Sequence, residues 1–195
     1  MKTTLPYTIN EDYRLKKLAK YTKNCHSVLD VGCIQYPNPY LHNNYVEGLD
    51  YNKGVLPSNY TNFIQGDLSD LVNKGKTYNG IVAGEVLEHI LNPIEFIQHC
   101  FQCLEPDGTL ALSTPNPHSP IEFILTGTLN KRYFYTEDHI MLFPQRWLIR
   151  MLTVCGFKDI SLHSGGFPLP PLGLIPFPRL FCHQTIAVAK KPKKT

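Results

Sequence analysis

The sequence has few charged residues and no long apolar run. Asp, Glu, Lys and Arg make up 18% of the 195 residues, against about 25% in ordinary soluble domains. The hydrophobic share of 43% is that of a globular protein and excludes general disorder. No stretch of 18 apolar residues is present, and the first residues lack the apolar core of a signal peptide. We therefore expect no transmembrane segment and a cytoplasmic location.

The six cysteines follow no spacing typical of a disulfide framework, which agrees with a reduced protein. Cys100 and Cys103 form a CxxC pair, which is half of a zinc site. No second pair of Cys or His with ligand spacing accompanies it, and the helical periodicity places Cys100 on an apolar stripe. We interpret both as buried thiols and predict no metal site.

Positive charge is concentrated in the tail. The formal net charge is +3, and the four lysines of residues 190–195 more than account for it. A protein dedicated to duplex nucleic acid gathers basic residues on a folded face, so this distribution counts against a nucleic-acid partner. The predicted N-terminal helix, 10–24, has a charge-rich face, which we interpret as solvated surface, with a functional basic patch as the alternative. That face carries Arg14, Lys16, Lys17, Lys20 and Lys23.

Four short apolar runs end at an acidic residue or a glycine with regular spacing. Gly32, Asp50, Asp67 and Glu85 follow one another at intervals of 18, 17 and 18 residues. Each interval accommodates one strand and a short crossover. This regularity predicts an α/β doubly wound sheet, in which ligands bind beyond the carboxyl ends of the strands.

The later part of the chain completes one predicted domain, 1–195, around a cofactor-binding core at 25–114. We expect helices at 93–104 and 144–154, a turn at 106–108, and strands at 109–114, 158–163 and 185–190. Two segments, 115–142 and 164–182, show neither the periodicity of a helix nor that of a strand. We expect both to be insertions on the acceptor side of the ligand site.

The first loop favours a nucleoside without a pyrophosphate. Asp30 and Gly32 end a buried strand, and Asp50 stands where such folds place the acid that binds the ribose hydroxyls. A nicotinamide enzyme needs G-x-G-x-x-G to hold a pyrophosphate. The loop reads GCIQYP from Gly32, which counts against a nicotinamide oxidoreductase.

Six motifs resemble the ordered motifs of class I S-adenosylmethionine-dependent methyltransferases. They are VLDVGC, GLDYN, GDLSD, AGEVLEHI, LEPDGTLALSTPNP and DHIMLF…CGF. Together they cover about residues 25–160, and the EVLEH box points to a small subgroup. The resemblance implies a Rossmann-like, seven-stranded, mostly parallel sheet whose last strand is antiparallel. It also implies S-adenosylmethionine as the cofactor and S-adenosylhomocysteine as the product.

The resemblance also implies the cofactor-binding residues. Asp30 and Gly32 would lie against the methionine part, and Asp50 would bind the ribose hydroxyls. Asp67, followed by Leu68, would bind the adenine end, and Glu85 would line the methyl-donor cleft. The family usually has further glycines after Gly32, and their absence here leaves a non-catalytic binding module of the same fold as an alternative.

Two histidines are candidates for catalysis. Methyl transfer from a sulfonium is an in-line displacement, for which a protein supplies alignment and, for a hydroxyl acceptor, a base. His89 and His139 are the candidates for this base. We therefore predict methyl transfer to a small-molecule or glycan-type acceptor, at a hydroxyl. Glu85, Glu88 and both histidines also resemble the metal site of small-RNA 2′-O-methyltransferases, which makes a metal-assisted RNA enzyme the alternative.

The Pro-rich segment 164–182 is too apolar for a solvated loop. We expect it to cover the acceptor pocket or to form the contact of a homodimer. Peripheral contact with a membrane surface, assisted by the basic tail at 190–195, is the remaining alternative.

Overall fold

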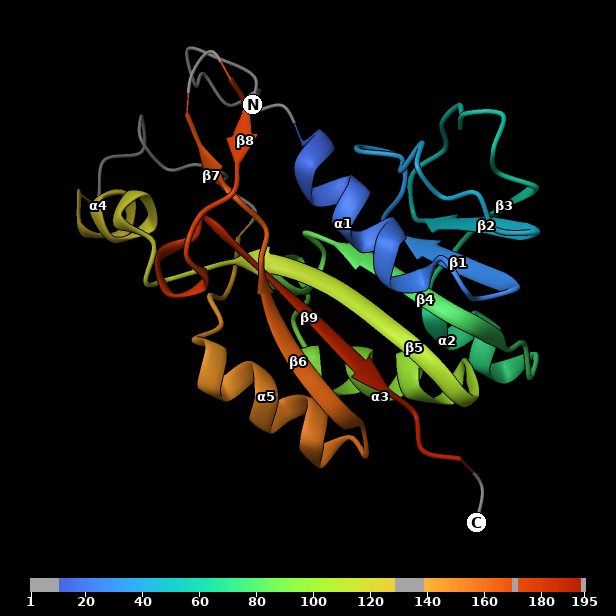
Figure 1. Ribbon diagram of the computed structural model, residues 1–195. Helices are drawn as coiled ribbons and strands as arrows, with labels where there is room; N and C mark the ends of the chain where they lie inside the picture. The colour runs from blue at the N-terminus through green and yellow to red at the C-terminus, as the bar shows by residue number, and fades with distance from the viewer. Residues whose placement is uncertain (1–10, 129–138, 170–171, 194–195) are drawn as a thin grey trace.

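The structure is a computed structural model that describes residues 11–128, 139–169 and 172–193. Its centre is a seven-stranded sheet (Figure 1). In spatial order the strands are β3 (Asn62–Gln65), β2 (Tyr45–Asp50), β1 (Ser27–Val31), β4 (Tyr78–Gly84), β5 (Leu104–Pro115), β9 (Gln184–Lys190) and β6 (Lys158–Ser164). In this sheet β9 runs antiparallel to both of its neighbours, β5 and β6, and the other neighbouring pairs are parallel. The predicted Rossmann-like sheet with an antiparallel last strand is confirmed.

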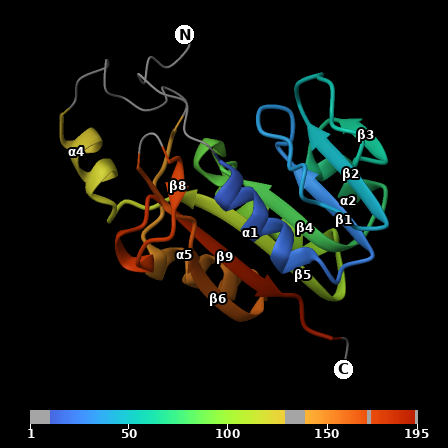
Figure 2. The ribbon, with the colours of Figure 1, turned by 45° about the horizontal axis from the view of Figure 1, so that its top comes forward.

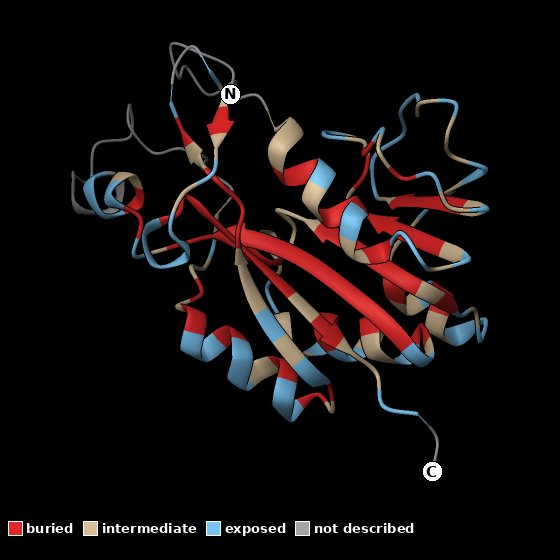
Figure 3. Ribbon diagram, in the orientation of Figure 1, coloured by how far each residue is buried: buried red, intermediate tan, exposed pale blue. Residues whose placement is uncertain are grey.

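Helices cover both faces of this sheet. The helix α1 (Asp12–Thr22) crosses one face over β4 and β5 (Figure 2). On the other face, α3 (Pro93–Gln102) contacts both α2 (Leu68–Asn73) and α5 (Gln145–Val154). Each face has its own apolar cluster, one around Leu18 of α1 and a larger one around Ile97 of α3. The central strands β1, β2, β4, β5 and β9 are therefore mostly buried, whereas the outer strands β3 and β6 are partly exposed (Figure 3).

Two of the helices, α2 and α3, begin at a residue whose side chain caps them. The side chain of Asp67 accepts hydrogen bonds from the amides of Ser69 and Asp70 at the start of α2. Asn92 caps α3 in the same way, and Pro93 occupies its first turn. No helix in the described part of the chain is long and apolar enough to cross a membrane.

The N-terminal half departs from the sequence prediction at Arg14. We predicted Arg14 on the solvated face of its helix, and this was wrong: Arg14 is 1% exposed and reaches toward β5. Between β1 and β2 the chain forms turns and loop instead of a crossover helix. Pro37 and Pro39, each lacking an amide hydrogen, fall in this connection.

The second half contains elements that the sequence analysis missed. A helix, α4 (Pro120–Thr128), lies in the segment predicted as irregular. The predicted turn at 106–108 lies inside β5, where Asp107 has φ 66°. Residues 164–182 include the two short strands β7 (Phe167–Pro168) and β8 (Leu174–Ile175) and the 3-10 helix η2 (Arg179–Phe181). Cys100 and Cys103 are buried and free, as expected.

Candidate active site

The register of the sheet brings the predicted acidic residues to one edge. Val31 pairs with Leu49 on one side and with Ala83 on the other, so β1, β2 and β4 end together. Asp30, Asp50, Asp67 and Glu85 lie at or just beyond these ends. This carboxyl edge is where a doubly wound sheet binds its ligand.

Asp30 is buried and held by a tyrosine that the sequence analysis did not single out. The hydroxyl of Tyr60 donates a hydrogen bond to Asp30 Oδ2 and accepts one, at 2.7 Å, from the amide of Asn38. Burial raises the pKa of Asp30 to about 7, although the bond from Tyr60 acts in the opposite direction. A cationic ligand group beside this carboxyl would favour its ionised form.

Gly32 occupies a position that only glycine fits without strain. Its φ is +74°, and a Cβ atom there would lie 2.5 Å from Cγ2 of Val86. Val86 is the second residue after the end of β4, so the chain after β1 passes close to the chain after β4. A side chain at residue 32 would push these two segments apart.

Asp50 organises the loop that lacks the usual glycines. Its Oδ2 accepts a hydrogen bond from the amide of Ile34 at 2.9 Å, and its Oδ1 accepts one from Asn52 at 2.8 Å. A carboxylate has about four acceptor positions. Asp50 can therefore hold both loops and still accept hydrogen bonds from a ligand.

Asp67, which we predicted to contact the adenine end of the cofactor, also has a structural role. It caps α2, and its Oδ2 accepts a hydrogen bond from the hydroxyl of Tyr51 at 3.1 Å. The hydrogen bond from Ser69 lowers the pKa of this carboxyl. Leu68 is 4% exposed and packs in the core. The assignment of Asp67 and Leu68 to the adenine end remains a prediction.

Glu85 is linked to Arg14 through Ser113. The hydroxyl of Ser113 donates to Glu85 Oε1 at 2.9 Å and accepts from Arg14 Nη1 at 3.2 Å. Glu11 Oε2 lies 2.6 Å from Arg14 Nε. Burial raises the pKa of Glu85 to about 7, against the attraction of the Arg14 guanidinium.

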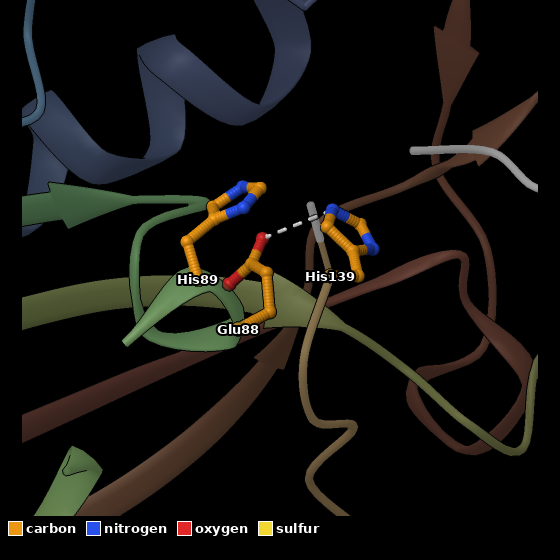
Figure 4. Close-up of side chains that lie close together, drawn as sticks. All are labelled: Glu88, His89 and His139. Atoms are coloured by element: carbon orange, nitrogen blue, oxygen red, sulfur yellow. Dashed lines mark ion pairs between the residues drawn. The ribbon is translucent and has the colours of Figure 1, made fainter. Parts of the chain in front are cut away.

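Glu88, His89 and His139 form a compact cluster beside this edge. Glu88 and His89 belong to the 3-10 helix η1 (Leu87–His89), and His139 comes from a distant part of the sequence. Nε2 of His139 lies 3.9 Å from Oε1 of Glu88, and the two imidazole rings meet edge to face at 4.8 Å (Figure 4). One ligand atom from each of the three residues lies within 4.8 Å of the others. Both predicted catalytic histidines are thus brought together.

Glu88 is the central residue of the cluster. Its side chain is fully buried, and its two carboxylate oxygens have no hydrogen-bond partner among the described residues. Burial, and then the nearby charge of Glu85, raise its pKa well above the usual value. Its main-chain oxygen accepts hydrogen bonds from the amides of Ile140 and Met141, which fix His139 beside η1.

A second buried pair joins α4 to the residue that directly precedes β9. Nδ1 of His183 is 3.8 Å from Oε1 of Glu122, and both side chains are buried. Burial raises the pKa of Glu122 to about 7 and lowers that of His183 to about 4. The charge of Glu85 also raises the pKa of Glu122. The two residues are far apart in the sequence and belong to no recognised motif, so the sequence analysis did not connect them.

The fold and the acidic carboxyl edge define a class I S-adenosylmethionine-dependent methyltransferase fold. The chain belongs to the methyltransferase-domain family, whose pattern it matches over residues 11–162. This confirms the family expected from the sequence motifs; the EVLEH subgroup stays a prediction.

Two curated relatives match shorter stretches. The ubiquinone biosynthesis O-methyltransferase of Bos taurus mitochondria is 49% identical over 41 residues, which are 21% of this chain and 11% of that protein. A probable S-adenosylmethionine-dependent methyltransferase of Mycolicibacterium smegmatis is 29% identical over 76 residues, which are 36% of this chain and 30% of that protein. The chain therefore matches less than a third of the length of each.

Solved structures share the fold over nearly the whole chain. A SAM-dependent methyltransferase from Archaeoglobus fulgidus has a TM-score of 0.72 at 18% identity and covers 92% of each chain. The plantazolicin methyltransferase BpumL, in complex with SAH, has a TM-score of 0.62 at 18% identity and covers 92% of this chain and 83% of that one. At this level of identity the likeness supports the fold.

Proposed function

We propose that this protein transfers the methyl group of S-adenosylmethionine to a hydroxyl of a small-molecule or glycan-type acceptor. The observation that carries the proposal is the His89–Glu88–His139 cluster beside the acidic carboxyl edge of the sheet. Membership of the methyltransferase-domain family supports the reaction type. The local match to an O-methyltransferase supports an oxygen acceptor.

The cofactor would lie along the carboxyl edge. Asp30 and the close approach of backbone at Gly32 would receive the methionine part, and Asp50 would accept hydrogen bonds from the ribose hydroxyls. Asp67 and Leu68 would contact the adenine end, and Glu85 would line the cleft near the methyl group. Neighbours of the same fold crystallise with S-adenosylhomocysteine, which supports this choice of cofactor.

The histidine cluster would act on the acceptor. His89 would take the proton of the hydroxyl as the methyl group moves, and His139 would orient the acceptor or share the proton. Oε1 of Glu88 lies 3.9 Å from Nε2 of His139. When the Glu88 carboxyl is ionised, its negative charge would stabilise the protonated imidazole of His139. Exclusion of water and alignment would supply the remainder of the rate enhancement.

Calorimetric titration with S-adenosylmethionine and S-adenosylhomocysteine, with and without chelator, tests whether the protein binds the methyl donor. Micromolar binding that chelator does not change would support the proposal. Failure of both ligands to bind would contradict it and favour a non-catalytic binding module. Turnover on a panel of hydroxyl acceptors then tests the base: His89→Gln should lower kcat by about 100-fold or more and leave cofactor affinity unchanged.

His99→Gln is the matched control for that substitution. His99 lies on α3 and outside the cluster, so this variant should retain wild-type turnover. Equal turnover in His89→Gln and His99→Gln would remove His89 as the base.

One observation favours a metal-assisted variant of the same reaction. A buried Glu88 carboxylate without a hydrogen-bond partner, beside two imidazoles, is a donor set that Mn²⁺ or another first-row divalent ion accepts. A bound cation would lower the pKa of the acceptor hydroxyl. Turnover that is lost with chelator and restored by Mn²⁺, but not in Glu88→Gln, would favour this second candidate over the metal-free enzyme.

A further inference from the structure

A basic groove lies on the α1 face of the molecule, away from the acidic edge. It is a cavity of about 190 Å³ between α1 and the loop that joins β1 to β2. Lys16, Lys20 and Lys23 line it from the helix, and Tyr40, His42 and Asn43 line it from the loop. No acidic side chain is part of its lining.

The three lysines share one side of the helix. Their spacing of four and three residues places them on successive turns of one face, along about 10 Å of helix. All three are exposed, and none has a carboxylate within ion-pair distance in the part of the chain that the structure describes. Lys16 lies over the ring of Tyr40, 4.9 Å from its centre. The groove therefore concentrates positive charge that no carboxylate of the described chain neutralises.

Hydrogen bonds fix both walls of the groove. Asn43 Nδ2 donates to the carbonyl oxygens of Thr22 and Cys25 at 2.8 and 2.7 Å. Asn38 Nδ2 donates to the carbonyl of Leu15 at 3.0 Å, and Asn38 Oδ1 accepts from the amide of Tyr40. The loop is thus tied to α1 at two points, and the lysines face a wall that is already in place.

The position separates this groove from the proposed active site. Asn43 bonds to residues just before β1, and β2 begins at Tyr45, which pairs with Ser27 at the first residue of β1. This end of the groove therefore lies by the amino ends of the strands, whereas Asp30, Asp50 and Glu85 lie at the carboxyl ends. A ligand in the groove would not occupy the cofactor site.

We propose that this groove binds a small anion that carries two or more phosphate charges. Ammonium groups surround a phosphate as point charges, whereas a carboxylate is best matched by the planar fork of Arg, and the groove has no Arg. The size of the cavity and the lack of net positive charge outside the tail argue against a nucleic-acid strand. The chemical class is a diphosphate or a phosphorylated metabolite.

Titration of the full chain with inorganic pyrophosphate tests this proposal. We expect saturable binding at about 50 mM salt that weakens at about 150 mM, because ionic strength screens exposed charges. The double variant Lys20→Gln/Lys23→Gln should lose about tenfold or more in affinity. The matched control Lys74→Gln/Lys158→Gln removes the same charge from exposed positions outside the groove and should lose less than about twofold.

Other ligands and a folding control complete the experiment. Thermal unfolding of both double variants should match that of the wild-type protein. Absence of pyrophosphate binding in the wild type, or equal loss in both double variants, would overturn the proposal. Binding of a short single-stranded RNA or of anionic vesicles without pyrophosphate binding would overturn it in favour of a macromolecular partner. Cofactor affinity should be the same in all variants, so this result is independent of the proposed methyl transfer.

Discussion

Tyr60 holds the buried carboxyl of Asp30 from a loop that precedes β3. Its hydroxyl is both the donor to Asp30 and the acceptor for the amide of Asn38. One phenol therefore joins the carboxyl edge of the sheet to the loop between β1 and β2.

Removal of this hydroxyl should affect both partners. We expect Tyr60→Phe to lower the free energy of unfolding by about 1–3 kcal/mol, because it leaves a buried carboxyl and an amide without their partner. It should also weaken S-adenosylmethionine binding. Urea unfolding and calorimetry measure the two effects. Tyr36→Phe, at a tyrosine that is 47% exposed, should change neither; equal behaviour of the two variants would contradict the role of Tyr60.

Gly32→Ala should combine two separable penalties. The left-handed backbone costs a residue with a Cβ about 1–2 kcal/mol, and the new Cβ meets Val86 at 2.5 Å. The double variant Gly32→Ala/Val86→Ala should relieve the contact and leave the backbone penalty. Chemical unfolding of both should therefore give a partial rescue. Full rescue would show that backbone strain contributes little.

Arg14 should be among the costliest residues to remove. Its buried guanidinium pairs with Glu11, and burial alone would lower its pKa, but Glu11 and Glu85 outweigh this effect and raise it. We expect Arg14→Leu to destabilise the protein by about 3–5 kcal/mol, because it leaves Glu11 and Glu85 without their cation. Arg146→Leu, at an exposed position on α5, is the control in the same denaturation experiment. A small loss in Arg14→Leu would mean that the carboxyls simply take up protons.

Two substitutions of Asp50 should weaken cofactor binding to different extents. Asp50→Ala should weaken S-adenosylmethionine binding by more than about tenfold, since a charge-assisted hydrogen bond contributes about 1.5–3 kcal/mol. Asp50→Asn keeps an acceptor for one of the two loop amides and should lose less. Calorimetric titration of both variants measures the difference. Unchanged affinity in Asp50→Ala would contradict the placement of the ribose.

The stability of the protein should depend on pH through Glu122. Its pKa is raised from 4.5 to about 7 in the folded state, so the folded protein holds this proton more tightly than the unfolded chain. Its contribution to stability is therefore full below pH 4.5 and is lost as the pH rises to about 7. Glu122→Gln should remove this part of the decline. His183, whose pKa is lowered to about 4, acts in the opposite direction and is present in both proteins. Measurements of the free energy of unfolding against pH compare the two proteins. Curves of the same shape for the wild type and Glu122→Gln would contradict the role of Glu122.

Local patterns were enough to predict most of the sheet. The β-branched and Leu-rich runs that end in Gly32, Asp50 and Glu85 are strands in the structure, because a parallel strand buried on both faces needs a continuous apolar run. The helix α4 was missed because residues 115–142 show no clear helical periodicity and contain several Pro and Asn residues. Pro120 at its start is nevertheless a common first helical residue.

The part of the candidate site whose residues come from one contiguous motif could be predicted from the sequence. The box around Glu85, Glu88 and His89 is contiguous, and His139 was already a candidate. Tyr60, Arg14 and the Glu122–His183 pair depend on contacts between distant segments. A spacing pattern cannot indicate that an arginine will be buried, because its partners Glu11 and Ser113 come together only in the folded chain.

The segment between β5 and α5 is hydrogen-bonded at both ends to other parts of the chain. Asn116 Nδ2 donates to the carbonyl oxygens of Leu180 and Cys182, and the amides of Ile140 and Met141 bond to Glu88. The position of His139 is therefore set by the hydrogen bonds of the residues that follow it. Under the proposed function this segment belongs to the acceptor side, and exchanging it for the corresponding stretch of another methyltransferase should change which acceptors are methylated.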